Sequence, residues 1–263
     1  MGVRSETVDL HDRLLRRLLD MRDPVTGVWN GELASSALGT ALAVTALVDG
    51  NAADRSLAHG GLTWLCANVN ADGGWGDTPD SLSNLSATLI AAAAVRNALE
   101  KLKPLPDELA LAAGVAADNA DVWIRARIGA LNPQNIGRAL AGVYGEDRTF
   151  AVPITAFLAM CADDPQAWLT VPPLPFLMAL LPRRLYGFMR LQVVSYALPA
   201  LIAVGICRHV CHAKARGNWA WGCFFAGRLL KNLEKMQPSH GGFLDAIPLT
   251  AFVCLALRHA GYA

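Results

Sequence analysis

A turn that is followed by an aromatic residue and an apolar helical stretch occurs twice near the start of the chain. The first copy is Gly27-Val28-Trp29, followed by Leu33 to Val48, and the second is Asp72-Gly73-Gly74-Trp75-Gly76, followed by Leu85 to Leu99. The two tryptophans are 46 residues apart, which is the length of a two-helix repeat. Glycine lets the chain turn after one helix, and the aromatic ring can cover the end of a neighbouring helix. The pattern predicts an array of helical hairpins.

Further along the chain the same kind of repetition continues. The string Pro153-Ile154-Thr155-Ala156-Phe157 recurs as Pro248-Leu249-Thr250-Ala251-Phe252, which is 95 residues later and equals about two repeat units. A looser copy of the turn is Met236-Gln237-Pro238-Ser239-His240-Gly241-Gly242-Phe243. We expect five residues in or near these turns to pack one repeat against the next. They are Trp29, Trp64, Trp75, Gln237 and Phe243.

The whole sequence favours helices over strands, because its long segments are rich in Ala and Leu and are separated by Gly, Pro and Asn-Asp turns. We predict an all-α fold, an α/α toroid in which hairpins stand in a ring, and a single domain spanning 1–263. The predicted helices lie near 7–22, 34–48, 56–69, 84–102, 107–117, 134–144, 153–162, 187–207, 222–236 and 248–259.

The chain is unusually apolar, with 53% hydrophobic and 17% charged residues and a mean hydropathy of +0.31. This suggests contact with lipid or with a missing partner surface. A membrane span needs roughly 18 or more uninterrupted apolar residues, and no such stretch occurs. The best candidate, Leu191 to Cys207, is interrupted by Gln192 and Pro199, so we read it as a buried core helix in preference to one that contacts the membrane.

Charge is distributed unevenly, although 23 basic residues nearly balance 22 acidic ones. Between Asp164 and Glu234 there is no acidic residue but there are eight basic ones. Because anionic lipid headgroups attract Lys and Arg, this stretch predicts a peripheral membrane surface. The start of the chain has no apolar signal segment, so we place the protein in the cytoplasm, at the inner face of the cell membrane. The predicted membrane-contact residues are Phe176, Leu177, Leu180, Arg183 and Arg184.

The turn around Trp75 resembles the QW motif of squalene-hopene and oxidosqualene cyclases, with Val69 in place of the usual glutamine. Related repeats also occur in protein prenyltransferase β-subunits. In the middle of the chain, the order of Gln134 to Gly145, Val171 to Phe176 and Gly187 to Val194 resembles the N-terminal half of bacterial squalene-hopene cyclases. The resemblance covers about residue 10 to the end. It implies that Phe188 and Arg190 lie at the substrate cavity, and it departs from the family at Phe176, where a glutamate is usual.

The resemblance implies acid-initiated polycyclisation of a C30 isoprenoid such as squalene, without a metal or an organic cofactor. These cyclases protonate an alkene with an Asp-x-Asp-Asp motif, which does not occur in this sequence. Protonation needs a polarised carboxylic acid and a dry, aromatic-lined cavity. We therefore name no catalytic residue and expect a C-terminal cyclase half, or a second copy, as partner. The alternatives are a stand-alone toroid that binds polyprenyl lipid or a partner helix, and a membrane protein with coincidental repeats.

The six cysteines lie mostly in apolar helical text and predict reduced, buried thiols. One cluster, Cys207-Arg208-His209-Val210-Cys211-His212, is the only stretch that suggests a metal. Zinc sites usually take four ligands from two separated pairs, and we read this cluster as the end of an apolar helix. We expect no metal site. The sequence has no Asp-x-Cys pair of a zinc-dependent prenyltransferase, no phosphate loop and no pattern typical of nucleic-acid binding.

Overall fold

The computed structural model describes residues 2–31, 33–145, 148–162, 164–174, 176–180, 197–216 and 223–262. Within these ranges the chain is helical with connecting turns, and the predicted all-α class is confirmed. Contacts divide the chain into two compact units, Met1–Ala34 and Ser35–Ala263, whereas the sequence predicts one domain over 1–263. We call these unit 1 and unit 2.

Unit 1 consists of helix α1 (Gly2–Asp20) and the turn that follows it. The Asp23 carboxylate accepts hydrogen bonds from the backbone N–H groups of Val25 and Thr26, and Gly27 has a φ of 70°. The indole N–H of Trp29 donates to the Leu18 carbonyl at 2.6 Å. The aromatic residue after the turn thus satisfies a carbonyl in the last turn of α1, which has no partner within the helix.

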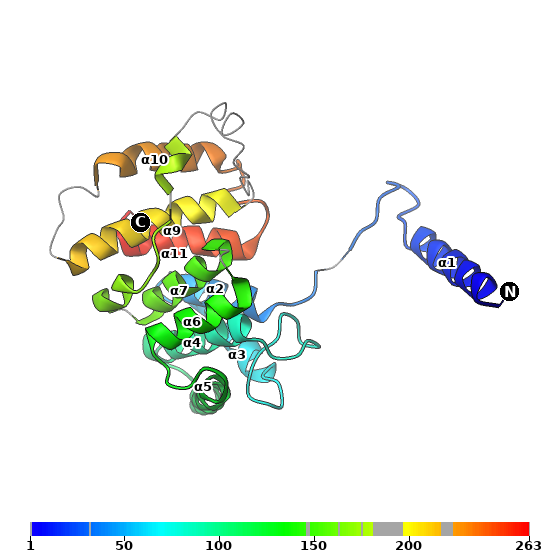
Figure 1. Cartoon of the computed structure of the whole chain (residues 1–263), viewed down its shortest axis with the longest axis horizontal. Helices are drawn as coiled ribbons and strands as arrows, with labels where there is room; N and C mark the ends of the chain where they lie inside the picture. Colours follow the sequence, from blue (N-terminus) through cyan, green and yellow to red (C-terminus); the bar gives the residue numbers. More distant parts are fainter. Residues whose placement is uncertain are drawn as a thin grey trace. The chain divides into compact units, whose positions relative to one another are not determined.

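The other helices among the described residues belong to unit 2, and several of them begin at a polar cap. Ser36, Asn51, Asn84 and Asn132 each accept a backbone N–H from the first turn of the helix that follows. Figure 1 shows the helices of this unit. They are α2 (Ala37–Leu47), α3 (Ala52–Ala67), α4 (Leu85–Lys101), α5 (Asp107–Ile128), α6 (Pro133–Tyr144), α7 (Arg148–Ala162), the 3₁₀ helices η1 (Pro165–Leu169) and η2 (Phe176–Leu180), α9 (Leu198–Ala215), α10 (Cys223–Met236) and α11 (Ile247–Ala260).

Five helices, α2, α4, α7, α9 and α11, pack in sequence order, and the last of them also packs against the first. We call them the central helices. Helix α3 packs on α2, α5 on α4, α6 on α7 and α10 on α9. The first two turns of all five central helices surround one apolar cavity, while their last turns meet in polar contacts. The central helices therefore run in the same direction.

Helices α1, α3 and α7 begin four or five residues before their predicted starts, and two helices extend well past their predicted ends. Helix α5 continues to Ile128, beyond the predicted end at 117, because Trp123 and Ile124 are buried against the rest of unit 2. Helix α9 continues to Ala215, so the segment from Cys207 to His212 lies inside it and does not end it. The part of the predicted helix 187–207 that precedes Ala197 lies outside the described residues. In the described part of the chain, no helix combines the length and hydrophobicity that crossing a bilayer requires.

Candidate binding cavity

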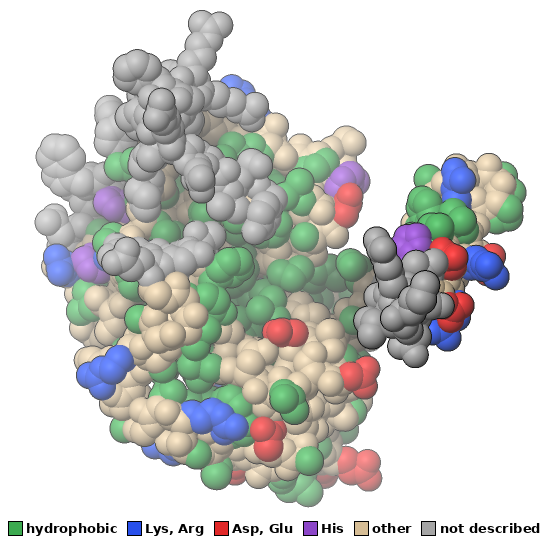
Figure 2. Space-filling view, turned by 45° about the vertical axis from the view of Figure 1, so that its right-hand side comes forward, with side chains coloured by type: hydrophobic (Ala, Val, Ile, Leu, Met, Phe, Trp, Pro, Cys, Tyr) green, Lys and Arg blue, Asp and Glu red, His purple; other side chains and the backbone are tan. Residues whose placement is uncertain are grey.

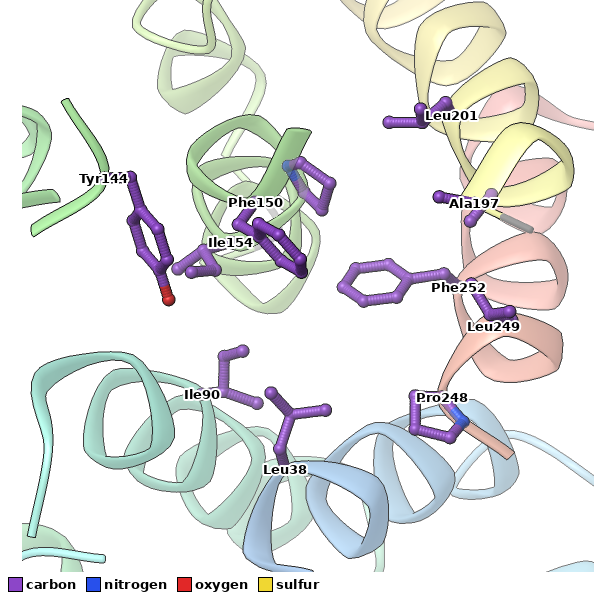
Figure 3. Close-up of a pocket in the computed structure, with 12 residues that line it drawn as sticks. Leu38, Ile90, Tyr144, Phe150, Ile154, Ala197, Leu201, Pro248, Leu249 and Phe252 are labelled. Atoms are coloured by element: carbon purple, nitrogen blue, oxygen red, sulfur yellow. The ribbon is translucent and has the colours of Figure 1, made fainter. Parts of the chain in front are cut away.

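An apolar cavity of about 180 Å³ lies between the first two turns of the central helices, and it is partly open to solvent. Figure 3 shows the rings of Phe150 and Phe252 pointing into the space between α7 and α11, with Leu38 and Ile90 on another side. Hydrophobic side chains also gather around a hollow on the face of unit 2 displayed in Figure 2. We call the space between these helices the apolar cavity. Its lining consists of Leu38, Ile90, Tyr144, Phe150, Pro153, Ile154, Ala197, Ala200, Leu201, Pro248, Leu249 and Phe252.

The repeated Pro-x-Thr-Ala-Phe strings form two facing walls of this cavity. Pro153 of α7 and Pro248 of α11 both line it. The rings of Phe157 and Phe252 meet edge to face, with their centroids 6.2 Å apart, a favoured arrangement of aromatic pairs. The two copies therefore pack against each other and place equivalent residues around the same space.

The polar atoms nearest the apolar cavity are already paired. The Tyr144 hydroxyl lies 2.7 Å from the Ser86 hydroxyl, and the Tyr144 ring stacks on Phe150 at 5.7 Å. Among the described lining residues none carries an acid, an amine, a guanidinium or an imidazole. The described lining thus suits a hydrocarbon, and its one ionisable side chain is the Tyr144 phenol, which is paired with Ser86.

The aromatic turns share one geometry. A glycine with positive φ stands two residues before the aromatic residue in each copy, namely Gly27 (70°), Gly73 (88°) and Gly241 (88°). The backbone N–H of Trp75 donates to the hydroxyl of Thr88, and that of Phe243 donates to the hydroxyl of Thr250, both at 3.0 Å.

The two tryptophans of these turns also bind the preceding helix in the same way. The indole of Trp75 donates to the Leu65 carbonyl at 3.0 Å, just as Trp29 donates to Leu18. Trp75 is 1% exposed, whereas Trp29 is 48% exposed. Of the other predicted repeat residues, Trp64 is half-buried beside the core, and exposed Gln237 donates to the Gly241 carbonyl at 2.7 Å.

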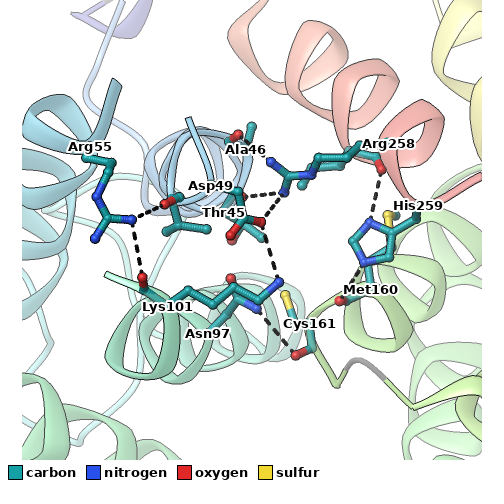
Figure 4. A network of polar contacts seen from close by, with 12 residues as sticks. Thr45, Ala46, Asp49, Arg55, Asn97, Lys101, Met160, Cys161, Arg258 and His259 are labelled. Atoms are coloured by element: carbon teal, nitrogen blue, oxygen red, sulfur yellow. Dashed lines mark hydrogen bonds and ion pairs between the residues drawn. The ribbon is translucent and has the colours of Figure 1, made fainter. Parts of the chain in front are cut away.

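The opposite ends of the central helices are held by a polar network (Figure 4). Arg258 of α11 donates to the Ala46 and Thr45 carbonyls of α2 at 3.1 and 3.2 Å. Asp49 accepts from Arg258 at 3.2 Å and from Lys101 of α4 at 3.5 Å. The network therefore joins the last central helix to the first two.

A second, polar cavity of about 220 Å³ lies at this end of unit 2. Its walls include Asp164, Cys211, Lys214 and His259. Both ring nitrogens of His259 face backbone carbonyls, Nδ1 at 3.1 Å from Leu255 and Nε2 at 3.0 Å from Met160. Burial lowers the pKa of His259 below its ordinary value, and nearby Arg258 acts in the same direction.

The predicted substrate-cavity residues Phe188 and Arg190, and the predicted membrane residues Arg183 and Arg184, lie outside the described residues. The described membrane candidates belong to η2. Leu177 is 44% exposed, whereas Phe176 and Leu180 are half-buried against the core. The Phe176 ring lies 5.8 Å from the His209 ring of α9. Among the side chains of η2 whose burial the structure describes, Leu177 is the one that is largely exposed.

The cysteine and histidine cluster of α9 does not gather into a four-ligand site. Cys207 and Cys211 bring their sulfur atoms to 3.9 Å, while His209 lies beside Phe176. In the described ranges no group of three or more His, Cys, Asp or Glu side chains is placed to hold a metal ion.

Sequence reasoning did not assign Phe150, Phe252 or Leu38 to a cavity. One signal was available, because Phe252 belongs to a repeated string, and repeated residues in parallel helices point at the same place.

Comparison with known protein families, with characterised proteins and with solved structures found no match to this chain.

Proposed function

We propose that unit 2 is a compact α/α toroid of the squalene-hopene-cyclase type, and that its apolar cavity binds the hydrocarbon part of an isoprenoid. The observation that carries this proposal is the cavity itself, which is formed by the first two turns of five helices that run in one direction. In a toroid the inner helices run parallel and are backed by outer helices. The packing of α3, α5, α6 and α10 on individual central helices supports this proposal.

The lining indicates which kind of ligand is favoured. Apolar and aromatic side chains stabilise a hydrocarbon, and aromatic faces also stabilise positive charge. The described lining has no Lys, Arg or His to pair with a diphosphate. At about 180 Å³ the cavity is smaller than the roughly 300–1,000 Å³ of drug-sized ligand sites. It would hold part of a C30 chain such as squalene, and the remainder would leave through the open side.

In the proposed reaction, a C30 isoprenoid is polycyclised after protonation of an alkene. That step needs a protonated carboxylic acid beside the alkene. No Asp or Glu is among the described lining residues. We therefore assign this chain the binding of the hydrocarbon, and assign the acid to a C-terminal cyclase half or to a second copy of the chain.

The second candidate function is a stand-alone toroid that binds a polyprenyl lipid without catalysis. It is favoured by the described lining, which contains no ionisable side chain besides the paired Tyr144 phenol. Both candidates predict binding, and they differ in what an added acid-bearing cyclase half does.

Binding is tested with the purified chain and squalene delivered from cyclodextrin. Bound squalene is quantified by mass spectrometry after gel filtration. Ala197→Phe places a ring at the cavity wall, and we expect it to reduce bound squalene at least tenfold. The matched control is Ala215→Phe, the same change in a half-buried alanine at the opposite end of α9, which should bind like the unmodified chain.

If Ala197→Phe retained as much squalene as the unmodified chain and still gave a helical circular dichroism spectrum, this would contradict binding in the apolar cavity. We expect squalene to be recovered unchanged from the chain alone. Cyclised product after addition of a cyclase half that carries Asp-x-Asp-Asp supports the first function. Unchanged squalene in that mixture supports the second.

We further propose that the chain associates with the cytoplasmic face of the membrane, where squalene-type lipids reside. The support is exposed Leu177 of η2, together with the absence of any acidic residue between Asp164 and Glu234 in the sequence. Sedimentation with liposomes that contain anionic lipid should occur at low salt and weaken at high salt. No sedimentation at low salt would refute the proposal.

A further inference from the structure

Two cysteines of α9 place their sulfur atoms side by side, far along the helix from the apolar cavity. Cys207 and Cys211 are four residues apart and therefore lie on the same helix face. Their Sγ atoms are separated by 3.9 Å, and the side chains are 0% and 8% exposed. The proposed binding of a hydrocarbon does not involve this pair.

The polar cavity gives access to one of the two thiols. Cys211 forms part of its wall, together with Lys214 and His259. Cys207 is fully buried beside Cys211. A small solute in the polar cavity thus reaches Cys211 first and has Cys207 directly behind it.

The spacing of the sulfurs favours a bridging ion over a disulfide. Residues i and i+4 of a helix have Cβ atoms about 5–6 Å apart, whereas a disulfide needs about 3.5–4.5 Å. A disulfide would therefore distort α9. Two thiolates hold Cu(I) in a nearly straight S–Cu–S line, which with metal–sulfur bonds of about 2.3 Å needs the sulfurs roughly 4.6 Å apart, so the observed 3.9 Å requires the two side chains to separate by roughly 0.7 Å.

The wall of the polar cavity also carries a cation. Lys214 shares this wall with Cys211, and a cation beside a thiolate pair offsets part of its negative charge. Asp164 is the one acid among the described residues of this wall, and the sequence then has no acid before Glu234.

We propose that Cys207 and Cys211 form a binding site for a soft monovalent metal ion of the Cu(I) type, reached through the polar cavity. Thiolates select such ions, and zinc would need more protein ligands than the two found here. On binding, two S–H bonds break, two metal–sulfur bonds form, and both protons pass to water. No electron is transferred, and the resulting complex carries one negative charge beside Lys214.

The test is a titration of the reduced full chain with Cu(I) under argon, in competition with a chromogenic Cu(I) chelator. One ion should bind per chain, and Cys207→Ala or Cys211→Ala should weaken binding at least tenfold. Cys254→Ala is the matched control, since it removes an exposed thiol of α11, and should bind Cu(I) like the unmodified chain. Unchanged binding by Cys211→Ala, or an equal loss in Cys254→Ala, would overturn the proposal.

A second readout uses the unmodified chain and does not depend on how the variants fold. Alkylation by iodoacetamide is mapped by mass spectrometry with and without one equivalent of Cu(I). Copper should protect Cys211 while exposed Cys254 still reacts. Equal labelling of Cys211 in both samples, or a disulfide between the two cysteines in the copper sample, would overturn the site.

Discussion

At the scale of single residues, the aromatic turn does two things in unit 2. A positive-φ glycine reverses the chain, and the aromatic residue two positions later donates its backbone N–H to a threonine of the next helix. In Trp75 the indole also binds the end of the preceding helix. One side chain thereby fixes the angle between two successive helices. Its burial determines how much the indole hydrogen bond contributes to the free energy of unfolding.

This comparison predicts a difference between two tryptophans that make the same bond. Trp75→Phe removes the indole donor at a 1% exposed site and leaves a gap, which should lower the free energy of unfolding by about 1–3 kcal/mol. Trp29→Phe removes the same donor at a 48% exposed site and should change the free energy of unfolding by less than about 0.5 kcal/mol. Urea denaturation followed by circular dichroism measures both, and equal losses would contradict the role of burial.

At the scale of the helical elements, side chains of other helices satisfy the final carbonyls of the central helices. The last four carbonyls of a helix lack intrahelical partners and attract cations. Arg55 of α3 donates to the Val48 carbonyl after α2 and to the Lys101 carbonyl of α4. Near the end of α7, the Met160 carbonyl faces the His259 ring. Each such contact fixes which helix ends lie together.

His259 gives this end of the array a dependence on pH. Because burial lowers its pKa in the folded state, the unfolded chain takes up a proton first as the pH falls. The free energy of unfolding that this residue contributes is therefore present above about pH 6.5, the ordinary value, and decreases below it. His259→Gln should flatten the change in stability between pH 7 and pH 5.

The control for this prediction is His212→Gln. Burial also lowers the pKa of His212, but this side chain is far less buried, so the change in slope should be smaller. Chemical denaturation at several pH values provides the measurement. An unaltered slope in His259→Gln would show that the residue does not couple folding to pH.

At the scale of the whole unit, contacts between the first and last central helices close the array. Arg258 reaches the carbonyls of Thr45 and Ala46, more than 200 residues earlier in the sequence. It also shares Asp49 with Lys101. Hydrogen bonds to a charged donor are worth about 1.5–3 kcal/mol, so this one side chain contributes measurably to closure.

We therefore expect Arg258→Met to lower the free energy of unfolding by about 2–3 kcal/mol. Arg258→Lys should restore only part of the loss, because an ammonium group lacks the planar fork that binds two carbonyls. The control is Arg13→Met in α1, where the arginine pairs with Asp9 in solvent and the change should be within about 0.5 kcal/mol. Thermal and urea unfolding provide the measurement. A free energy of unfolding for Arg258→Met equal to that of the unmodified chain would contradict the prediction.

Local signals predicted many of the helices well. Helix α4 was expected at 84–102 and spans Leu85–Lys101, and α6 was expected at 134–144 and spans Pro133–Tyr144. In the structure both begin after an asparagine that caps the first turn, which is an interaction between neighbouring residues. Helix α5 was predicted too short because Asp118-Asn119 is typical of a turn. Its continuation is stabilised by burial of Trp123, whose indole donates to Asp72 at 2.7 Å.

The sequence by itself determined the helical class, the caps and the glycine turns, because these depend on interactions within a few residues of one another. Only the tertiary structure decided that the first two turns of five helices line one cavity and that Phe157 meets Phe252. It also decided that Cys211, but not Cys207, forms part of the polar cavity wall. These features depend on which helix faces pack together across long stretches of sequence, and local propensity carries no information about that pairing.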